Sequence, residues 1–178
     1  EHCIKDLSLD ERYKPRLCRS VISRAKTDFL GVEEFAEKRK EPLYPKLADV
    51  YERYQAGLRE ANALDFDDLI FFTVRLLSEY EEVRQRIQNR FRYVLVDEFQ
   101  DTNPLQYRLV SLLVKDGNIC VVGDDDQSIY RFMGASVKNI LGFEDRFAGT
   151  RVIRLEQNYR STQVILDAAN EVISHNEN

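Results

Sequence analysis

Asp97 and Glu98 are adjacent carboxylates placed where a folded chain could use them for chemistry. They follow the apolar run at residues 93–96, which has the length and β-branched content of a buried strand. In open α/β sheets, ligands bind beyond the carboxyl ends of the strands. One carboxylate there can hold a metal ion while its neighbour orients or deprotonates a water. The pair predicts a Mg-nucleotide site, with an exposed acidic turn as the alternative.

Two further apolar runs lead into polar clusters in the same way. Residues 119–122 precede a Gly-Asp-Asp-Asp-Gln sequence that ends at Gln127. Residues 152–155 precede a Glu-Gln-Asn-Tyr-Arg sequence that ends at Arg160. Three such strands would deliver carboxylates for a cation, a glutamine for a phosphate or water, and an arginine for developing negative charge. Together they predict one site rather than three unrelated acidic turns.

Composition limits the class of protein. The 178 residues suit one domain, or one domain with a subdomain. A net charge of −5 argues against a whole-surface nucleic-acid binder, though not against a local basic groove. Three cysteines without CxxC spacing and two histidines make a zinc site unexpected, and Cys120 is expected to be buried and reduced. No signal peptide or transmembrane run is visible, which predicts a cytoplasmic protein without a membrane partner.

The first 60 or so residues are charged, poor in glycine and helical in pattern. Residues 11–26 are basic and form either a solvated helix face or a phosphate-contacting surface. Their cationic side chains are Arg12, Lys14, Arg16, Arg19, Arg24 and Lys26. A set of apolar residues further on recurs at helical spacing and is expected in the core. Its members are Leu47, Val50, Tyr51, Tyr54 and Leu58.

Capping residues predict three helices between and after the strands. Asp65 suits an N-cap, and Asp67 and Asp68 suit the positive first turn that follows. The buried stripe of that helix is expected to be Leu69, Phe72, Leu76 and Leu77. Pro104 suits the first position of a second helix, which Gly117 would end. Its apolar face is expected to be Leu105, Leu109, Leu112 and Leu113.

Ser161 is expected to cap the last helix. The apolar residues of that helix are Val164, Ile165, Ala168, Ala169, Val172 and Ile173. Strands that alternate with helices predict an α/β fold with a parallel sheet and right-handed crossovers.

The polar clusters resemble the motifs of superfamily 1 DNA helicases of the UvrD/Rep/PcrA type. Residues 95–103 are similar to their Walker B motif, 122–132 to motif III and 155–161 to motif IV, and the sequence at 64–69 also recurs in that family. Order and spacing agree over nearly the whole chain, and long ordered motif sets are specific. The resemblance implies a partial RecA-like parallel sheet of the P-loop NTPase type, with a helical N-terminal subdomain.

The resemblance also implies a division into three parts. Residues 1–61 would be part of a helical insertion subdomain, and residues 62–158 the C-terminal part of the first motor domain. Residues 159–178 would form the motif IV helix that leads to a second motor domain. The chain has no GxxxxGK[ST] sequence, so the phosphate-binding loop is expected upstream. We therefore expect a middle fragment that does not hydrolyse ATP alone and that self-associates through exposed sheet edges.

The resemblance assigns roles in the hydrolysis of ATP with Mg²⁺ as cofactor. Asp97 would hold Mg²⁺, usually through water, and Glu98 would be the general base. Gln127 would sense the γ-phosphate, and Arg160 would stabilise the transferring phosphoryl group as an arginine finger. Tyr159 would stack near the adenine, with core packing as its alternative. Local turn and capping roles are expected for the three aspartates that precede Gln127.

Tyr130 and Phe132 would offer aromatic faces to unstacked DNA bases, which is a sequence-tolerant contact. For Phe132 the alternative is core packing. Met133 stands where the family usually has an arginine, which can reach DNA phosphate or couple motif III to its surroundings, and methionine can do neither. The partners implied are single-stranded DNA and junctions between single- and double-stranded DNA.

Four functions remain open from the sequence. The first is an ATP-driven 3′-to-5′ DNA translocase and helicase of repair or replication. The second is the motor part of a helicase–nuclease in recombinational repair. The third is a metal-dependent phosphohydrolase or nuclease, which would cleave with Mg²⁺ but without nucleotide and would leave Gln127 and Arg160 without a role. The fourth is a non-catalytic interaction module that retains the motifs.

Overall fold

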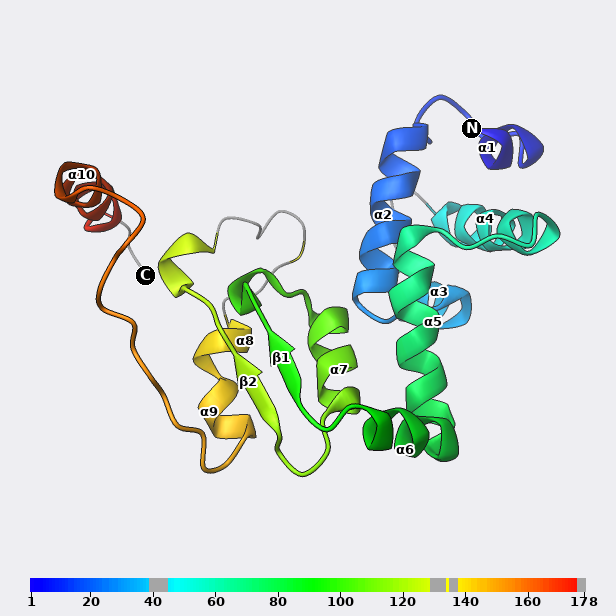
Figure 1. Cartoon of the computed structure of the whole chain (residues 1–178). Helices are drawn as coiled ribbons and strands as arrows, with labels where there is room; N and C mark the ends of the chain where they lie inside the picture. Colours follow the sequence, from blue (N-terminus) through cyan, green and yellow to red (C-terminus); the bar gives the residue numbers. More distant parts are fainter. Residues whose placement is uncertain (39–44, 129–133, 135–137, 176–178) are drawn as a thin grey trace.

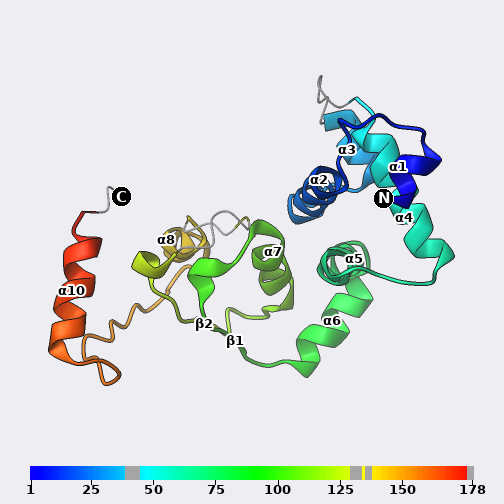
Figure 2. The same cartoon turned by 90° about the horizontal axis from the view of Figure 1, so that it is seen from above.

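The computed structural model describes residues 1–38, 45–128, 134 and 138–175. Its first half is helical: α1 (His2–Asp6), α2 (Pro15–Thr27), α3 (Val32–Lys38), α4 (Leu47–Glu60), α5 (Phe66–Glu79) and α6 (Glu81–Arg90). Its second half mixes strands and helices: β1 (Val94–Val96), η1 (Phe99–Asp101), α7 (Pro104–Leu113), β2 (Ile119–Val121), η2 (Asp125–Gln127), α8 (Lys138–Leu141), α9 (Phe143–Arg146) and α10 (Gln163–Ile173). Figures 1 and 2 show α1–α4 on one side and the β-strands on the other, with α5 and α7 packed together between them.

The first four helices have their own core, formed where α1, α2 and α3 pack against α4. Its buried apolar residues are Tyr13, Cys18, Ile22, Ala25, Phe35, Leu47, Val50 and Tyr51. The prediction from helical spacing is confirmed for Leu47, Val50 and Tyr51, whereas Tyr54 and Leu58 are half-buried. Tyr51 also donates a hydrogen bond from its hydroxyl to the carbonyl of Leu30. None of the described helices is both long and apolar enough to cross a bilayer.

Helix α5 begins where its cap predicts but buries a different face. Asp65 accepts a hydrogen bond from the backbone N–H of Asp68, whose side chain accepts from the N–H of Asp65, so the two form a capping box. The predicted stripe is wrong except for Leu77: Leu69, Phe72 and Leu76 are exposed. The residues that face the core are Asp68, Phe71, Val74 and Leu77. A search for apolar residues at helical spacing does not identify this face, because Asp68, the first of its four buried residues, is a carboxylate.

Helix α7 confirms its predicted start. Asn103 and Gln106 form a reciprocal capping box, and Pro104 occupies the first turn. The helix packs along α5, where Leu105 joins Phe71 and Val74 in a small core that Leu109 and Leu112 extend. It ends at Leu113, so Gly117, with a φ of +70°, serves the turn before β2 rather than the helix end.

Strands β1 and β2 pair in parallel, with Leu95 opposite Cys120, and α7 connects them (Figure 1). Val96 and Val121 face a core built from Phe99, Tyr107 and Phe143, which α8 and α9 help to cover. Successive strand residues point to opposite faces. Leu95 and Cys120 lie on the other face and are exposed, so the prediction of a buried Cys120 is wrong. The described residues cover only one face of this sheet.

The third predicted strand does not form. Residues 152–155 have no regular structure in the described chain, and Val152, Ile153 and Leu155 are exposed. A strand requires a hydrogen-bonding neighbour, and no described segment pairs with this run. Helix α10 follows with Thr162, not Ser161, at its N-cap, and it lies apart from the other elements (Figures 1 and 2). The structure is therefore mostly helical with a small parallel sheet, which is compatible with part of an α/β domain.

Candidate functional site

The carboxyl ends of β1 and β2 bring the first two polar clusters together. Because the strands are parallel, Val96 and Val121 end at the same edge of the sheet. Two hydrogen bonds extend the pairing beyond the strands: Val122 N–H donates to Val96 O at 2.8 Å, and Phe99 N–H donates to Val122 O at 2.9 Å. The turn after β1 and the turn after β2 are thus fixed against each other. The prediction of a shared edge is confirmed for these two clusters.

Asp97 and Glu98 are both exposed at this edge. Glu98 has a φ of 50° and a ψ of 44°, the left-handed conformation, which a residue other than glycine adopts at a cost of about 1–3 kcal/mol. Its N–H donates to Asp97 Oδ1 at 2.9 Å. This reversal turns the chain into η1 and leaves both carboxylates open to solvent. A ligand beyond the strand ends can therefore reach them.

A magnesium ion fits this pair of carboxylates. Mg²⁺ keeps several waters and usually takes one or two carboxylates plus substrate phosphates, rather than a cage built only from protein. In the described parts of the chain, no group of three or more His, Cys, Asp or Glu side chains is placed to hold a metal ion. Asp97 would supply the protein ligand, and waters and substrate phosphates would supply the rest.

The turn after β2 carries Gln127 at the end of η2. Asp124 caps that turn, because Oδ1 accepts from the N–H of Asp126 at 3.1 Å. Its Oδ2 accepts from Gln127 Nε2 at 2.5 Å. The expected capping role is confirmed for Asp124. Gln127 is exposed and lies on the same edge of the sheet as the two carboxylates.

The third cluster does not join this site. Tyr159 is 91% exposed, so it is not a core residue in this chain. Asn158 Oδ1 accepts from the N–H groups of Arg160 and Ser161, which makes a local turn. Within the described residues, neither Tyr159 nor Arg160 contacts Asp97 or Glu98. The cause is the missing third strand, which was expected to carry Arg160 to the sheet edge.

The predicted DNA-contacting residues Tyr130 and Phe132 lie outside the described residues, as does Met133. Their roles stay predictions.

Sequence reasoning missed Gln100, which is 1% exposed beneath the site. Its Nε2 donates to Glu98 Oε2 at 2.7 Å, and its Oε1 accepts from the N–H of Asp124 at 3.1 Å. Its position in a run of polar residues gives no sign of burial. Only the packing of the two turns makes it an interior residue.

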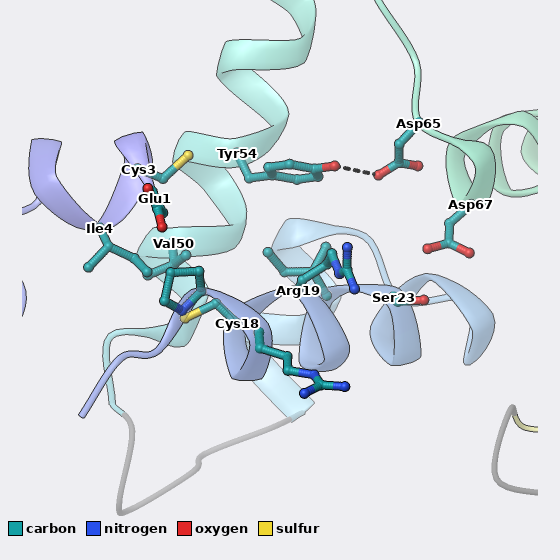
Figure 3. Close-up of a pocket in the computed structure, with 13 residues that line it drawn as sticks. Glu1, Cys3, Ile4, Cys18, Arg19, Ser23, Val50, Tyr54, Asp65 and Asp67 are labelled. Carbon is teal, nitrogen blue, oxygen red and sulfur yellow. Dashed lines mark hydrogen bonds between the residues drawn. The ribbon is translucent and has the colours of Figure 1, made fainter. Parts of the chain in front are cut away.

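Sequence reasoning also missed Lys26, which was grouped with the basic residues of a surface. It is fully buried, with Nζ 2.6 Å from Asp65 Oδ2 and 2.8 Å from Asp68 Oδ1. The Tyr54 hydroxyl donates to Asp65 Oδ2 at 2.9 Å, and both residues line a pocket of about 480 Å³ between α1, α2, α4 and the start of α5 (Figure 3). Gln55 Nε2 donates to Asp68 at 3.1 Å. This buried cluster, Lys26 with Asp65 and Asp68, joins α2 and α4 to α5.

Burial and hydrogen bonding act in opposite directions on the pKa of the Asp65 carboxyl. Burial by itself would raise its pKa, but hydrogen bonds from Lys26, from the backbone of Asp68 and from Tyr54 outweigh it and hold the pKa below the ordinary value. Burial, with the Asp65 carboxylate beside it, also raises the pKa of the Tyr54 hydroxyl. Helix α4 is therefore joined to the start of α5 by the ionised Asp65 and the neutral Tyr54.

A parallel sheet with paired carboxylates beyond its strand ends is what a nucleotide-using α/β domain would place there. The family comparison agrees with this class: residues 2–148 match the family described as UvrD/REP helicase N-terminal domain, and the chain belongs to that family.

Curated relatives of the chain are named as helicases. It is 47% identical over 175 residues to the ATP-dependent DNA helicase PcrA of Leuconostoc citreum. It is 49% identical over 184 residues to the ATP-dependent DNA helicase UvrD1 of Mycobacterium tuberculosis (strain H37Rv). It is 47% identical over 177 residues to the ATP-dependent DNA helicase PcrA of Bacillus subtilis (strain 168). These alignments cover 97–98% of this chain and 23–24% of the relatives, so the chain spans about a quarter of their length.

Proposed function

We propose that this chain is part of an ATP-dependent DNA helicase that couples Mg-ATP hydrolysis to 3′-to-5′ movement on single-stranded DNA in repair or replication. The observation that carries the proposal is the exposed pair Asp97 and Glu98, held beyond two parallel strands against the turn that bears Gln127. The names of relatives at 47–49% identity support the same reading. We use the term extended protein for this chain within a longer sequence that has the length of the relatives.

The two carboxylates have different tasks in this proposal. Asp97 would hold Mg²⁺, which when bound would supply positive charge that offsets the negative charge of the phosphates. Glu98 orients the attacking water and accepts its proton. Gln127 lies on the adjoining turn, where its amide can contact the γ-phosphate or the water. Tyr159 stacks near the adenine, while Tyr130 and Phe132 contact DNA bases.

The proposed fold is a partial RecA-like sheet of the P-loop NTPase type. Residues 1–61 form the helical insertion, 62–158 the C-terminal part of the first motor domain, and 159–178 the motif IV helix. The exposed face of Leu95 and Cys120 and the unpaired run at 152–155 support the presence of further sheet elements in the extended protein. The phosphate-binding loop, absent from these 178 residues, would come from such an element, so this chain alone would not hydrolyse ATP.

Arg160 gives a prediction about the chemistry. If motif IV folds against the sheet edge in the extended protein, Arg160→Ala should lower kcat for ATP by on the order of a thousandfold. The KM for ATP should change far less, because the guanidinium acts on charge that develops during phosphoryl transfer. Steady-state hydrolysis with single-stranded DNA measures both constants. Arg151→Ala, at another exposed arginine, is the matched control, and a loss confined to ATP affinity would contradict the finger role.

Strand separation tests the direction of movement. The extended protein is incubated with Mg-ATP and with duplexes that carry either a 3′ or a 5′ single-stranded tail. We expect separation of the 3′-tailed duplex only, since movement starts on the single strand. Separation from the 5′ tail would overturn the polarity, and cleavage of DNA without nucleotide would support the metal-dependent nuclease instead.

A further inference from the structure

Gln100 is a buried amide that contacts both turns of the candidate site. Its Nε2 donates to Glu98 Oε2 at 2.7 Å, and its Oε1 accepts from the N–H of Asp124 at 3.1 Å. An ionised carboxylate only accepts, and a backbone N–H only donates. The two partners therefore fix the orientation of the amide, and a side chain that is only a donor or only an acceptor cannot satisfy both.

The space around this amide is tight enough to hold it in place. A Cβ added at Gly123 would lie 2.5 Å from Gln100 Oε1, 2.9 Å from Ile140 Cδ1 and 3.3 Å from the backbone nitrogen of Gln100. Gly123 is thus the residue that allows the turn after β2 to rest directly on Gln100. Ile140 closes the space from α8.

A continuous chain of hydrogen bonds joins the two candidate catalytic residues through Gln100. It runs from the Glu98 carboxylate to the Gln100 amide, then to the backbone of Asp124. Asp124 Oδ2 accepts from Gln127 Nε2 at 2.5 Å. Phe99 N–H also donates to Val122 O at 2.9 Å, so a backbone hydrogen bond joins the same two turns. The Glu98 carboxylate and the turn that carries Gln127 are therefore connected by both side-chain and backbone hydrogen bonds.

We propose that Gln100 is a positioning residue that holds the Glu98 carboxylate in register with the turn carrying Gln127. This inference rests on the proposed function, because it assigns Gln100 a task in ATP hydrolysis. Glu98 is exposed, and an exposed glutamate side chain otherwise samples several rotamers. The buried amide selects one of them. The nearby carboxylates of Asp97 and Asp124 only accept hydrogen bonds, here from backbone N–H groups, so neither can donate to Glu98 in place of Gln100.

Gln100→Met in the extended protein tests this role. Methionine keeps the length of the side chain and removes both hydrogen bonds. We expect kcat for DNA-stimulated ATP hydrolysis to fall by about tenfold to a hundredfold, since small misplacements of a catalytic group have effects of this size. The KM for ATP should stay near the parental value. The product of the single-variant losses for Gln100→Met and Gln127→Ala should exceed the loss in the double variant, because both act through one connection.

A measurement without nucleotide separates positioning from activity. Amide hydrogen exchange of the segment 119–127 reports on the Asp124 N–H, which loses its acceptor in Gln100→Met. We expect faster exchange there in the nucleotide-free protein. Gln55→Met is the matched control, because Gln55 is also a buried glutamine that donates to a carboxylate, at 3.1 Å from Asp68. It should leave both the exchange of this segment and kcat unchanged.

Several outcomes would overturn the proposal. One is an unchanged kcat in Gln100→Met while Glu98→Gln abolishes hydrolysis. Another is a loss in Gln100→Met that Gln55→Met reproduces at an equal drop in Tm. If Gln100→Met does not fold, Gly123→Ala displaces the same amide and should lower kcat with KM retained; an unchanged kcat there also overturns it. Absence of hydrolysis in the parental extended protein would instead contradict the proposed function.

Discussion

Replacing Glu98 by glutamine should lower the ATP hydrolysis rate of the extended protein by about a hundredfold to ten-thousandfold, the range for a lost general base. ATP binding should persist. In the parental chain Gln100 Nε2 donates to Glu98 Oε2 at 2.7 Å, and the amide oxygen of the new glutamine can still accept this hydrogen bond. The geometry is therefore retained, and only the acceptance of the proton from water is lost. Single-turnover hydrolysis, together with equilibrium binding of ATP, measures the two effects separately.

The control for this experiment is Glu82→Gln, which changes an exposed glutamate on α6, outside the candidate site. It should leave the rate near the parental value. A parental rate in Glu98→Gln would remove Glu98 from the base role. Equal losses of rate and of ATP binding would indicate that Glu98 acts in binding.

Replacing Lys26 by methionine should destabilise the chain by about 3–5 kcal/mol, the usual effect of breaking a buried ion pair by removing one partner. Lys26 and Asp68 are both fully buried, with Nζ 2.8 Å from Oδ1. Methionine fills the space of the lysine stem but leaves the Asp68 charge without its cation. The expected loss is a large fraction of the stability of a domain this size.

Urea unfolding of the 178-residue chain, followed by circular dichroism, measures this loss. Lys46→Met is the matched control, because Lys46 pairs with Asp49 at 2.9 Å on the surface, where ion pairs contribute little. The combined change of Lys26→Met and Asp68→Leu should recover part of the stability, since no unpaired charge remains at Asp68. Equal, small effects of Lys26→Met and Lys46→Met would contradict the buried cluster.

The buried cluster also predicts how stability depends on pH. The pKa of Asp65 is lowered in the folded chain, because hydrogen bonds from Lys26, from the backbone of Asp68 and from Tyr54 outweigh its burial. A carboxyl with a lowered folded-state pKa contributes stability above the ordinary value of 3.8 and loses it as the pH falls through the folded-state pKa. Unfolding free energies measured from neutral pH to below 3.8 should show this loss. The loss should be smaller in Lys26→Met, and an identical pH dependence would contradict the coupling.

The features that the sequence predicts correctly are those set by neighbouring residues. The N-cap at Asp65 and the helix start at Pro104 depend only on residues within one turn of the helix end. The strands β1 and β2 are short apolar runs that end in turns, and the helix between them makes a parallel pairing the expected connection. Asp97 and Glu98 come directly after the last residue of β1, so the end of this strand places them beyond the edge of the sheet.

The features that the sequence misses depend on partners far away in the chain. The buried face of α5 contains Asp68 only because Lys26 of α2 neutralises it. Gln100 becomes an interior residue because Gly123, on another turn, packs against it. Residues 152–155 have the composition of a strand but no described neighbour to pair with, so Arg160 is not brought to the site. In each case a local pattern carries no information about the contact that decides the outcome.

We propose that Asp97 and Glu98 serve DNA-stimulated hydrolysis of Mg-ATP in the extended protein. ATP hydrolysis by the 178-residue chain and by the extended protein, each with and without single-stranded DNA, tests this role. We expect hydrolysis only in the extended protein, with a higher rate when DNA is present. Hydrolysis at a comparable rate by the 178-residue chain alone would contradict the need for a phosphate-binding loop outside it, and an extended protein without ATP hydrolysis would contradict the role of the two carboxylates.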